Sequence, residues 1–79
     1  MPLATLVATN LRAARAHRSL SQQALAKKTK LSVSYISMLE RGQRTPPLET
    51  LEALAKALAV APLDLFKERS AKRPRRGKR

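Results

Sequence analysis

The chain has 79 residues, and 17 Lys and Arg against 5 Asp and Glu give it a formal net charge of +12. This length fits one small domain, and the charge favours a polyanionic partner, either nucleic acid or an anionic membrane surface. Because there is no Cys, disulfides, thiolate metal sites and cysteine nucleophiles are excluded, and one Tyr and one Phe are too few for a platform that stacks single-stranded bases.

The basic residues gather at the two ends of the chain. Residues 1–45 hold eight Lys and Arg and one acid, residues 46–66 have a net charge of −2, and residues 67–79 carry +7. Because residues 69–79 have no apolar side chain larger than that of alanine, we predict a folded domain over 1–68 followed by a disordered basic tail. The tail either solubilises the chain or adds contacts to phosphates.

The first helix is predicted over about residues 4–17, where apolar residues recur at spacings of three and four. Ser21 is a favourable N-cap for a short second helix over Gln22–Thr29. These two predicted helices carry apolar residues facing a common core, and the second is followed after a few residues by another helical pattern.

A third helix is predicted over Val33–Arg41, with Ser32 as its N-cap and Gly42 as a left-handed C-cap. Lys30, Leu31 and Ser32 form the tight connection to the second helix. Two short helices joined by a turn of three or four residues form a helix-turn-helix arrangement.

The fourth helix is predicted to begin at Pro47, a residue that suits a first helical turn. Its apolar stripe consists of Leu48, Leu51, Leu54, Ala55 and Leu58. Pro62 opens a short fifth helix over about Leu63–Lys67. Alternating apolar and polar residues are absent, so the sequence predicts an all-α bundle of five short helices.

The third helix has an uncharged side opposite its apolar face. Ile36 and Leu39 share the face that enters the core, and a solvated helix surface in so basic a protein would normally carry charges. Serine hydroxyls pair with base edges, and valine and methionine contact thymine methyl groups in the major groove. The uncharged side is therefore the candidate base-contacting surface, although ordinary surface residues are the alternative; it comprises Val33, Ser34, Ser37 and Met38.

Candidate phosphate contacts flank this side. Ser21 and Gln22 begin the second helix, where free N–H groups and the positive end of the helix dipole attract a phosphate. Tyr35 either donates its hydroxyl to the DNA backbone or packs on the second helix, and Lys27 and Lys28 either contact DNA or are only solvated. Further candidates follow the third helix, namely Arg41, Gln43, Arg44 and Thr45.

Glu40 is the one acid among the first 45 residues, and it falls at the end of the third helix. A free carboxylate at that position would repel phosphate, so we predict that it pairs with an arginine. We choose Arg15 of the first helix, and we interpret the pair as a structural brace between the two helices.

Several separated motifs resemble one family. Residues 20–42, LSQQALAKKTKLSVSYISMLERG, resemble the DNA-binding domain shared by lambda-type phage repressors, Cro proteins and bacterial XRE regulators. Residues 44–60 and 63–66 are similar to the fourth and fifth helices of that domain, and residues 11–15 to the end of its first helix. The likeness covers about residues 5–67.

The resemblance implies a compact, five-helix, lambda-repressor-like domain that binds operator DNA as a symmetric homodimer. It places Gln22 at a phosphate-contacting position, the uncharged side of the third helix at base-contacting positions, and Arg15 with Glu40 at a bracing ion pair. It also implies that Leu63 and Phe66 lie in the dimer interface.

Three features depart from the family pattern. Lys30 stands where the turn usually has Gly, and a left-handed Lys costs on the order of 1 kcal/mol. Ala61 replaces the usual polar cap of the fifth helix. The base-contacting positions lack Gln, Asn and Arg, so we expect specificity to rest on methyl contacts, DNA shape and the arginines.

The leading interpretation is a sequence-specific regulator that binds double-stranded DNA at a pseudo-palindromic operator as a homodimer, with a regulatory protein partner left open. An adaptor that keeps the fold but binds protein is one alternative, and a non-specific nucleic-acid binder acting through the tail is another. We find no catalytic set, metal site or cofactor motif, and we expect no enzyme and no cofactor. Because no signal peptide or membrane-spanning run is recognised, we expect a cytoplasmic, nucleoid-associated protein.

Overall fold

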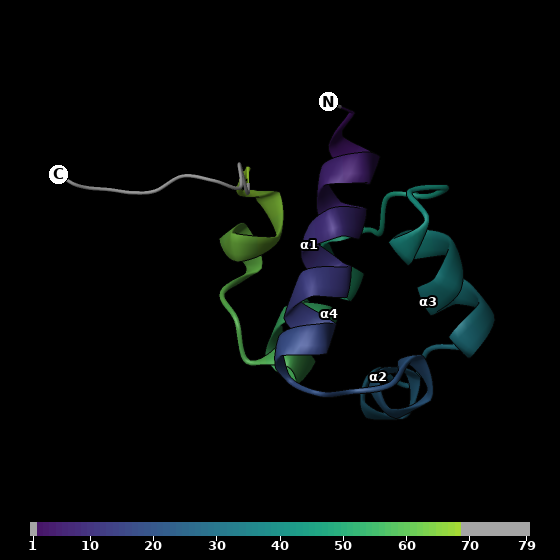
Figure 1. Ribbon diagram of the computed structural model, residues 1–79. Coiled ribbons are helices and arrows are strands. Elements are labelled where there is room, and N and C mark those ends of the chain that lie inside the picture. Colours follow the sequence, from purple (N-terminus) through teal and green to yellow (C-terminus); the bar gives the residue numbers. More distant parts are fainter. Residues whose placement is uncertain (1, 69–79) are drawn as a thin grey trace, which may run out of the picture.

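The computed structural model describes residues 2–68, and the predicted tail over 69–79 lies outside the described residues. Within that range the chain is helical and contains no strand, which confirms the prediction of an all-α fold (Figure 1). The order of elements is α1 (Leu3–His17), α2 (Gln22–Thr29), α3 (Val33–Glu40), α4 (Leu48–Leu58) and the 3-10 helix η1 (Pro62–Phe66).

A short helix is present at the predicted position of the fifth helix, but it is a 3-10 helix, so the described residues contain four α-helices rather than five. Pro62 occupies the first position, and Ala61 before it has no side-chain oxygen that could cap an α-helix. The N–H of Asp64 donates to the carbonyl oxygen of Ala61 at 2.9 Å, a three-residue step typical of 3-10 geometry. The backbone is extended again at Lys67, so η1 ends after five residues.

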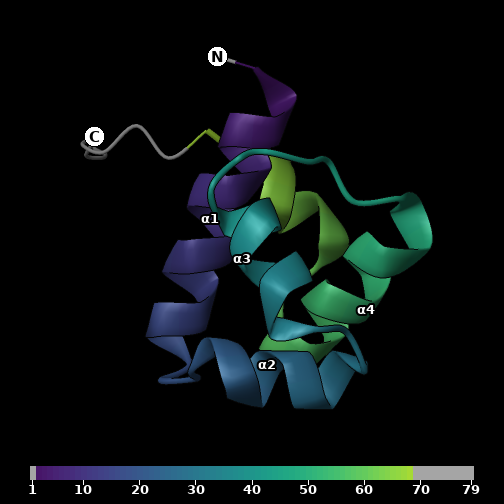
Figure 2. The ribbon, with the colours of Figure 1, turned by 90° about the vertical axis from the view of Figure 1, so that its right-hand side faces the viewer.

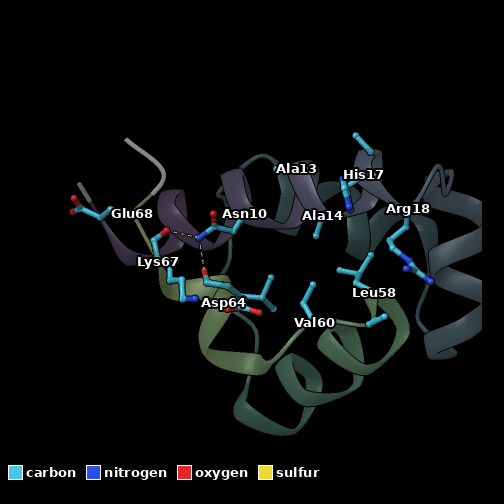
Figure 3. A pocket seen from close by; sticks show the side chains of 13 residues that line it. Asn10, Ala13, Ala14, His17, Arg18, Leu58, Val60, Asp64, Lys67 and Glu68 are labelled. Atoms are coloured by element: carbon cyan, nitrogen blue, oxygen red, sulfur yellow. Dashed lines mark hydrogen bonds and ion pairs between the residues drawn. The ribbon is translucent and has the colours of Figure 1, made fainter. Parts of the chain in front are cut away.

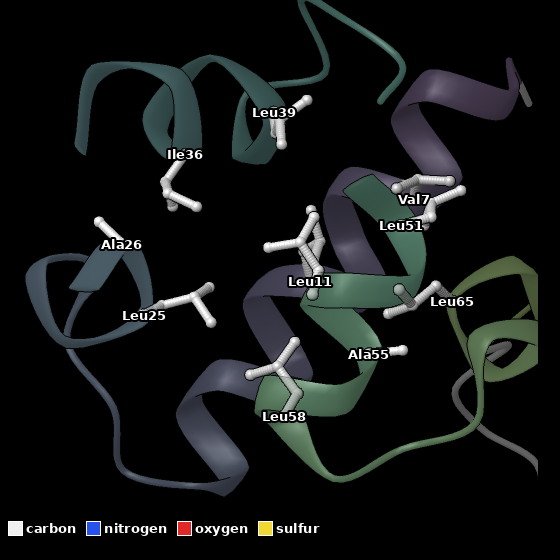
Figure 4. Packing of buried hydrophobic residues seen from close by; sticks show 11 residues of the cluster. Val7, Leu11, Leu25, Ala26, Ile36, Leu39, Leu51, Ala55, Leu58 and Leu65 are labelled. Atoms are coloured by element: carbon white, nitrogen blue, oxygen red, sulfur yellow. The ribbon is translucent and has the colours of Figure 1, made fainter. Parts of the chain in front are cut away.

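The helices enclose one apolar core (Figure 4). α1 packs against α3 on one side and against η1 on the other, whereas α2 packs against α3 and α4. The predicted apolar stripe of α4 is buried except at its first residue, since Leu48 is 76% exposed, and Leu3 at the start of α1 is 52% exposed. The core consists of Val7, Leu11, Leu25, Ala26, Ile36, Leu39, Leu51, Leu54, Ala55, Leu58 and Leu65.

This packing places α3 and η1 on opposite sides of α1 (Figure 1). Figure 2 shows α3 toward the viewer, with α2 beneath it and α4 to one side. A surface on α3 and a surface on η1 can therefore contact different partners at the same time. None of the helices in the described part of the chain is long and apolar enough to cross a membrane.

Candidate nucleic-acid interface

Two serine caps define where α2 and α3 begin. The Ser21 hydroxyl oxygen accepts a hydrogen bond from the N–H of Ala24 at 2.9 Å, and the Ser32 hydroxyl oxygen accepts one from the N–H of Tyr35 at 3.0 Å. Each cap satisfies one of the N–H groups that the first turn of a helix leaves without a partner. The predicted starts of both helices are confirmed.

The turn between α2 and α3 depends on Lys30, which has left-handed backbone angles of φ 62° and ψ 29°. The N–H of Leu31 then donates to the carbonyl oxygen of Ala26 at 3.0 Å, and Leu31 packs against the core. The left-handed lysine expected from the sequence is thus present. Glycine would adopt this conformation without the steric cost, on the order of 1 kcal/mol, that a side chain adds.

The uncharged side of α3 faces away from the core. Ile36 and Leu39 are buried on the opposite face, at 1% and 0% exposure. Val33 is 40% exposed, Ser34 is exposed, and Ser37 and Met38 are half-buried. The four residues predicted to contact bases therefore share one accessible surface of a single helix.

Exposed polar residues follow the end of α3. Gly42 has a φ of 73°, and the N–H of Gln43 donates to the carbonyl oxygen of Met38 at 3.0 Å, which closes α3 with a left-handed C-cap as predicted. The candidate phosphate contacts occupy the C-cap of α3 and the loop that follows it. These exposed residues are Arg41, Gln43, Arg44 and Thr45.

The predicted ion pair between Arg15 and Glu40 is present. The Arg15 Nε lies 2.6 Å from Glu40 Oε2, and its Nη2 donates to Oε1 at 3.0 Å. Gln22 Nε2 donates to the same Oε1 at 2.9 Å, and Arg12 donates to the backbone carbonyl oxygen of Glu40. One carboxylate therefore joins α1, α2 and α3.

This carboxylate is charged but hidden. Burial opposes the ionisation of Glu40, but hydrogen bonds from Arg15 and Gln22 and the charges of Arg15 and Arg12 outweigh it, so its pKa lies below the ordinary value. The same hydrogen bond raises the pKa of Arg15. Since Glu40 is only 3% exposed, the acid at the end of α3 presents almost no negative surface to an approaching phosphate.

Two candidate phosphate contacts also have roles within the fold. Gln22 donates one of its two amide N–H groups to Glu40, so the other N–H remains for another acceptor. Of the two alternatives for Tyr35, packing is observed, because its half-buried ring lies against the core. Lys27 and Lys28 are exposed on α2.

Asn10 is a structural residue that the sequence analysis missed. It is 2% exposed, and its Nδ2 donates to the carbonyl oxygens of Leu65 and Lys67, each at 2.8 Å (Figure 3). The signal was available, because Asn10 falls three residues after Val7 on the apolar stripe, and a polar residue there must find partners. It attaches η1 to α1.

The η1 surface next to this attachment is only partly free. Leu63 is 74% exposed, whereas Phe66 is half-buried and packs against the core. An open groove separates α1 from the segment that leads from α4 into η1, and Ala13, Ala14 and Val60 are among the residues that line it (Figure 3). Of the two residues assigned to a dimer interface, Leu63 alone has a mostly exposed side chain.

Comparison with known proteins gives consistent matches. The family model described as Helix-turn-helix (HTH_3) matches residues 11–65. The uncharacterized HTH-type transcriptional regulator y4dJ of Sinorhizobium fredii is 37% identical over 65 residues, 82% of this chain and 84% of that protein. The immunity repressor protein of Bacillus phage phi105 is 44% identical over 54 residues, 68% of this chain but only 38% of that protein.

Solved structures match over similar lengths. The restriction-modification controller protein C.AhdI from Aeromonas hydrophila superposes with a TM-score of 0.77 at 38% identity, covering 80% of this chain and 96% of that chain. A hypothetical transcription factor, NHTF from Neisseria, superposes with a TM-score of 0.80 at 33% identity, covering 84% of this chain and 76% of that chain.

Proposed function

Because the chain belongs to the helix-turn-helix family of DNA-binding transcriptional regulators of the XRE type, we propose that it reads a specific double-stranded operator through α3. The observation that carries the proposal is the accessible, uncharged side of α3 in an otherwise cationic region. The four residues concerned are Val33, Ser34, Ser37 and Met38.

In the proposed complex, α3 lies in the major groove. The hydroxyls of Ser34 and Ser37 donate to or accept from base edges, and the apolar ends of Val33 and Met38 contact thymine methyl groups. Because the side chains of Val33, Ser34 and Ser37 are short, the backbone of α3 approaches the bases closely. Without bidentate Gln, Asn or Arg contacts, part of the selectivity comes from DNA shape.

The phosphate contacts set the register of α3. The Ser21 hydroxyl accepts from its own helix but still has a proton to donate, and Gln22 has a second amide N–H. Arg41 and Arg44, which are exposed at and after the end of α3, add cationic donors to the phosphates that border the groove. The exposed Gln43 and Thr45 supply further donors, and Tyr35 adds its hydroxyl while its half-buried ring stays packed against the core.

We propose further that the protein acts as a homodimer on a pseudo-palindromic operator. The exposed Leu63 of η1 is the apolar contact, and the half-buried edge of Phe66 borders it. A two-fold dimer presents two α3 helices about 34 Å apart, one turn of B-DNA. The basic residues over 69–79 add affinity that depends on salt.

The reading surface is tested by selecting bound fragments from random duplex DNA. The wild type should yield a two-fold symmetric consensus, and the double variant Ser34→Ala/Met38→Ala should lose about 1–3 kcal/mol of discrimination per altered base contact. Lys27→Ala, an exposed change on α2, is the matched control and should keep the consensus. An unchanged consensus in the α3 variant would remove α3 from the role of reader.

The dimer is tested separately by sedimentation. Leu63→Asp should convert dimer to monomer and weaken binding to a full operator far more than to an isolated half-site. Phe66→Asp is unsuitable as the only test, because Phe66 packs against the core and its loss would also destabilise the fold. A dimer that survives Leu63→Asp would place the interface elsewhere.

A further inference from the structure

The solvent-facing side of α4 is divided by charge. Glu49 and Glu52 lie in its first half and Lys56 in its second half, and all three are exposed. Within residues 2–68 the ion pairs are those of Arg15 with Glu40 and of Lys67 with Asp64, so these three α4 charges have no ion-pair partner there. Spacings of three and four residues place the three charges on one helix face.

Lys56 belongs to a cationic cleft between α2 and α4. Lys28 and Lys30 line the same cleft, and the small side chains of Ala53 and Ala57 line it from α4. Three exposed ammonium groups around one depression make it electropositive, which favours an acidic partner, most strongly at low salt.

The chain itself carries the matching acidic surface. If two copies of α4 lie antiparallel across a two-fold axis near Ala53, Glu49 of each copy meets the lysine cleft of the other, because Glu49 and Lys56 lie at similar distances on either side of Ala53. The small Ala53 at the axis permits close approach of the two helices. We propose that the solvent face of α4 is a self-complementary contact surface for a second copy of this protein.

The size of the surface sets the strength of the contact. α4 has 11 residues, which corresponds to a length of about 16 Å, so the buried area falls in the class of weak, transient interfaces. The charges fix the antiparallel orientation and make association sensitive to salt.

This contact is distinct from the one proposed at η1, and it leaves the α3 surface free. α3 packs on α1 and α2, and Figure 2 shows α4 to one side of it. The residues that line the cleft come from the end of α2, the turn after it and α4. A protein that pairs through η1 would therefore link to a neighbouring pair through α4. The two interfaces are each two-fold, so together they join pairs side by side.

The cysteine-free sequence allows a direct test by oxidative cross-linking at low salt. Ala53→Cys should form a disulfide-linked dimer about tenfold faster than Ala16→Cys, which places the cysteine at an exposed control position on α1. The reason is that electrostatic steering between complementary surfaces raises association rates by about tenfold or more. Both variants also carry Leu63→Asp, which removes the proposed η1 contact. Equal rates for the two cysteines would overturn the proposal, whatever the operator experiments show.

Charge exchange tests the complementarity itself. In the Ala53→Cys background, Glu49→Lys/Glu52→Lys makes the α4 face basic, and Lys28→Glu/Lys56→Glu makes it acidic. Neither variant alone should cross-link faster than the Ala16→Cys control, but an equal mixture of the two should recover fast cross-linking. Fast linking by either variant alone, or a mixture no faster than the same mixture carrying Cys at position 16, would contradict the proposed pairing.

Discussion

Replacing Arg15 with methionine tests whether the buried carboxylate at the end of α3 depends on its arginine. Arg15→Met removes both charge-assisted hydrogen bonds to Glu40 but keeps an unbranched side chain. Glu40 is 3% exposed and would retain Gln22 as its side-chain partner. Removal of one partner from a buried ion pair costs about 3–5 kcal/mol. The free energy of unfolding of a chain of this length is about 4–12 kcal/mol in total, so the variant should be close to unfolding.

Glu40→Gln is the milder companion variant. It keeps the volume of Glu40 and an oxygen that can accept from Arg15 and Gln22. The Arg15 side chain is 22% exposed and can reach water, so the expected loss is about 1–3 kcal/mol. The double variant Arg15→Met/Glu40→Gln should lose less than the sum of the single losses, because no charge is then left buried without its partner.

The dependence on pH has a defined sign. In the wild type the pKa of Glu40 is lowered by folding, so its contribution is present above the ordinary value of about 4.5 and is lost as the pH falls through the lower folded value. In Arg15→Met, burial of Glu40 without the arginine raises its pKa. Acid then protonates the buried carboxylate, which removes the unpaired charge and stabilises the variant. The difference in free energy of unfolding between the wild type and Arg15→Met should therefore become smaller as the pH is lowered.

Urea unfolding followed by circular dichroism, at about pH 7 and about pH 4, measures both effects. If Arg15→Met is largely unfolded at neutral pH, the measurement is made at low temperature. Glu40→Gln, which should stay folded, then provides a second comparison with the wild type. A loss of less than about 1 kcal/mol in the free energy of unfolding at neutral pH would mean that the pair behaves as a surface salt bridge. The pair of Arg15 and Glu40 would then contribute little to holding α1 against α3. A difference in free energy of unfolding that becomes larger in acid would contradict a pKa of Glu40 that is lowered in the wild type and raised in Arg15→Met.

Three further changes test other parts of the fold and of the proposed function. Ala59→Gly, at a left-handed position with a φ of 59°, should raise Tm by a few degrees, whereas Ala57→Gly inside α4 should lower it; thermal unfolding separates the two. Asn10→Ala should remove two buried hydrogen bonds and speed amide hydrogen exchange in η1 more than in α2. Deletion of residues 70–79 should reduce the salt dependence of DNA affinity but keep the operator preference, as measured by titration at several salt concentrations.

The parts of the fold that local chemistry decides could be predicted from the sequence. Ser21 and Ser32 cap the helices that follow them, and Gly42 ends α3, because each acts on backbone groups within a few residues. The pair of Arg15 and Glu40 was also predictable, although it joins distant helices. Glu40 was the single acid in a basic region, so electrostatics left few acceptable environments for it.

The remaining features depend on contacts between distant segments. Asn10 holds η1 through carbonyl oxygens more than fifty residues away, and no periodicity specifies which carbonyls a buried amide will reach. The same holds for Gln22, whose side chain turns toward Glu40 because Arg15 has already placed that carboxylate. η1 is a 3-10 helix rather than an α-helix because its five residues, between an extended Ala61 and an extended Lys67, are too few to propagate α-helical hydrogen bonds.

α1 determines how the two proposed surfaces lie relative to each other. Through Arg15 it is attached to α3, and through Asn10 to η1, on its two opposite sides. If a dimer forms through η1, the separation of its two α3 helices is then set by residues that touch neither DNA nor the partner. Half-site spacing in the operator should consequently respond to substitutions at Asn10, whereas base preference within each half-site should respond to substitutions on α3.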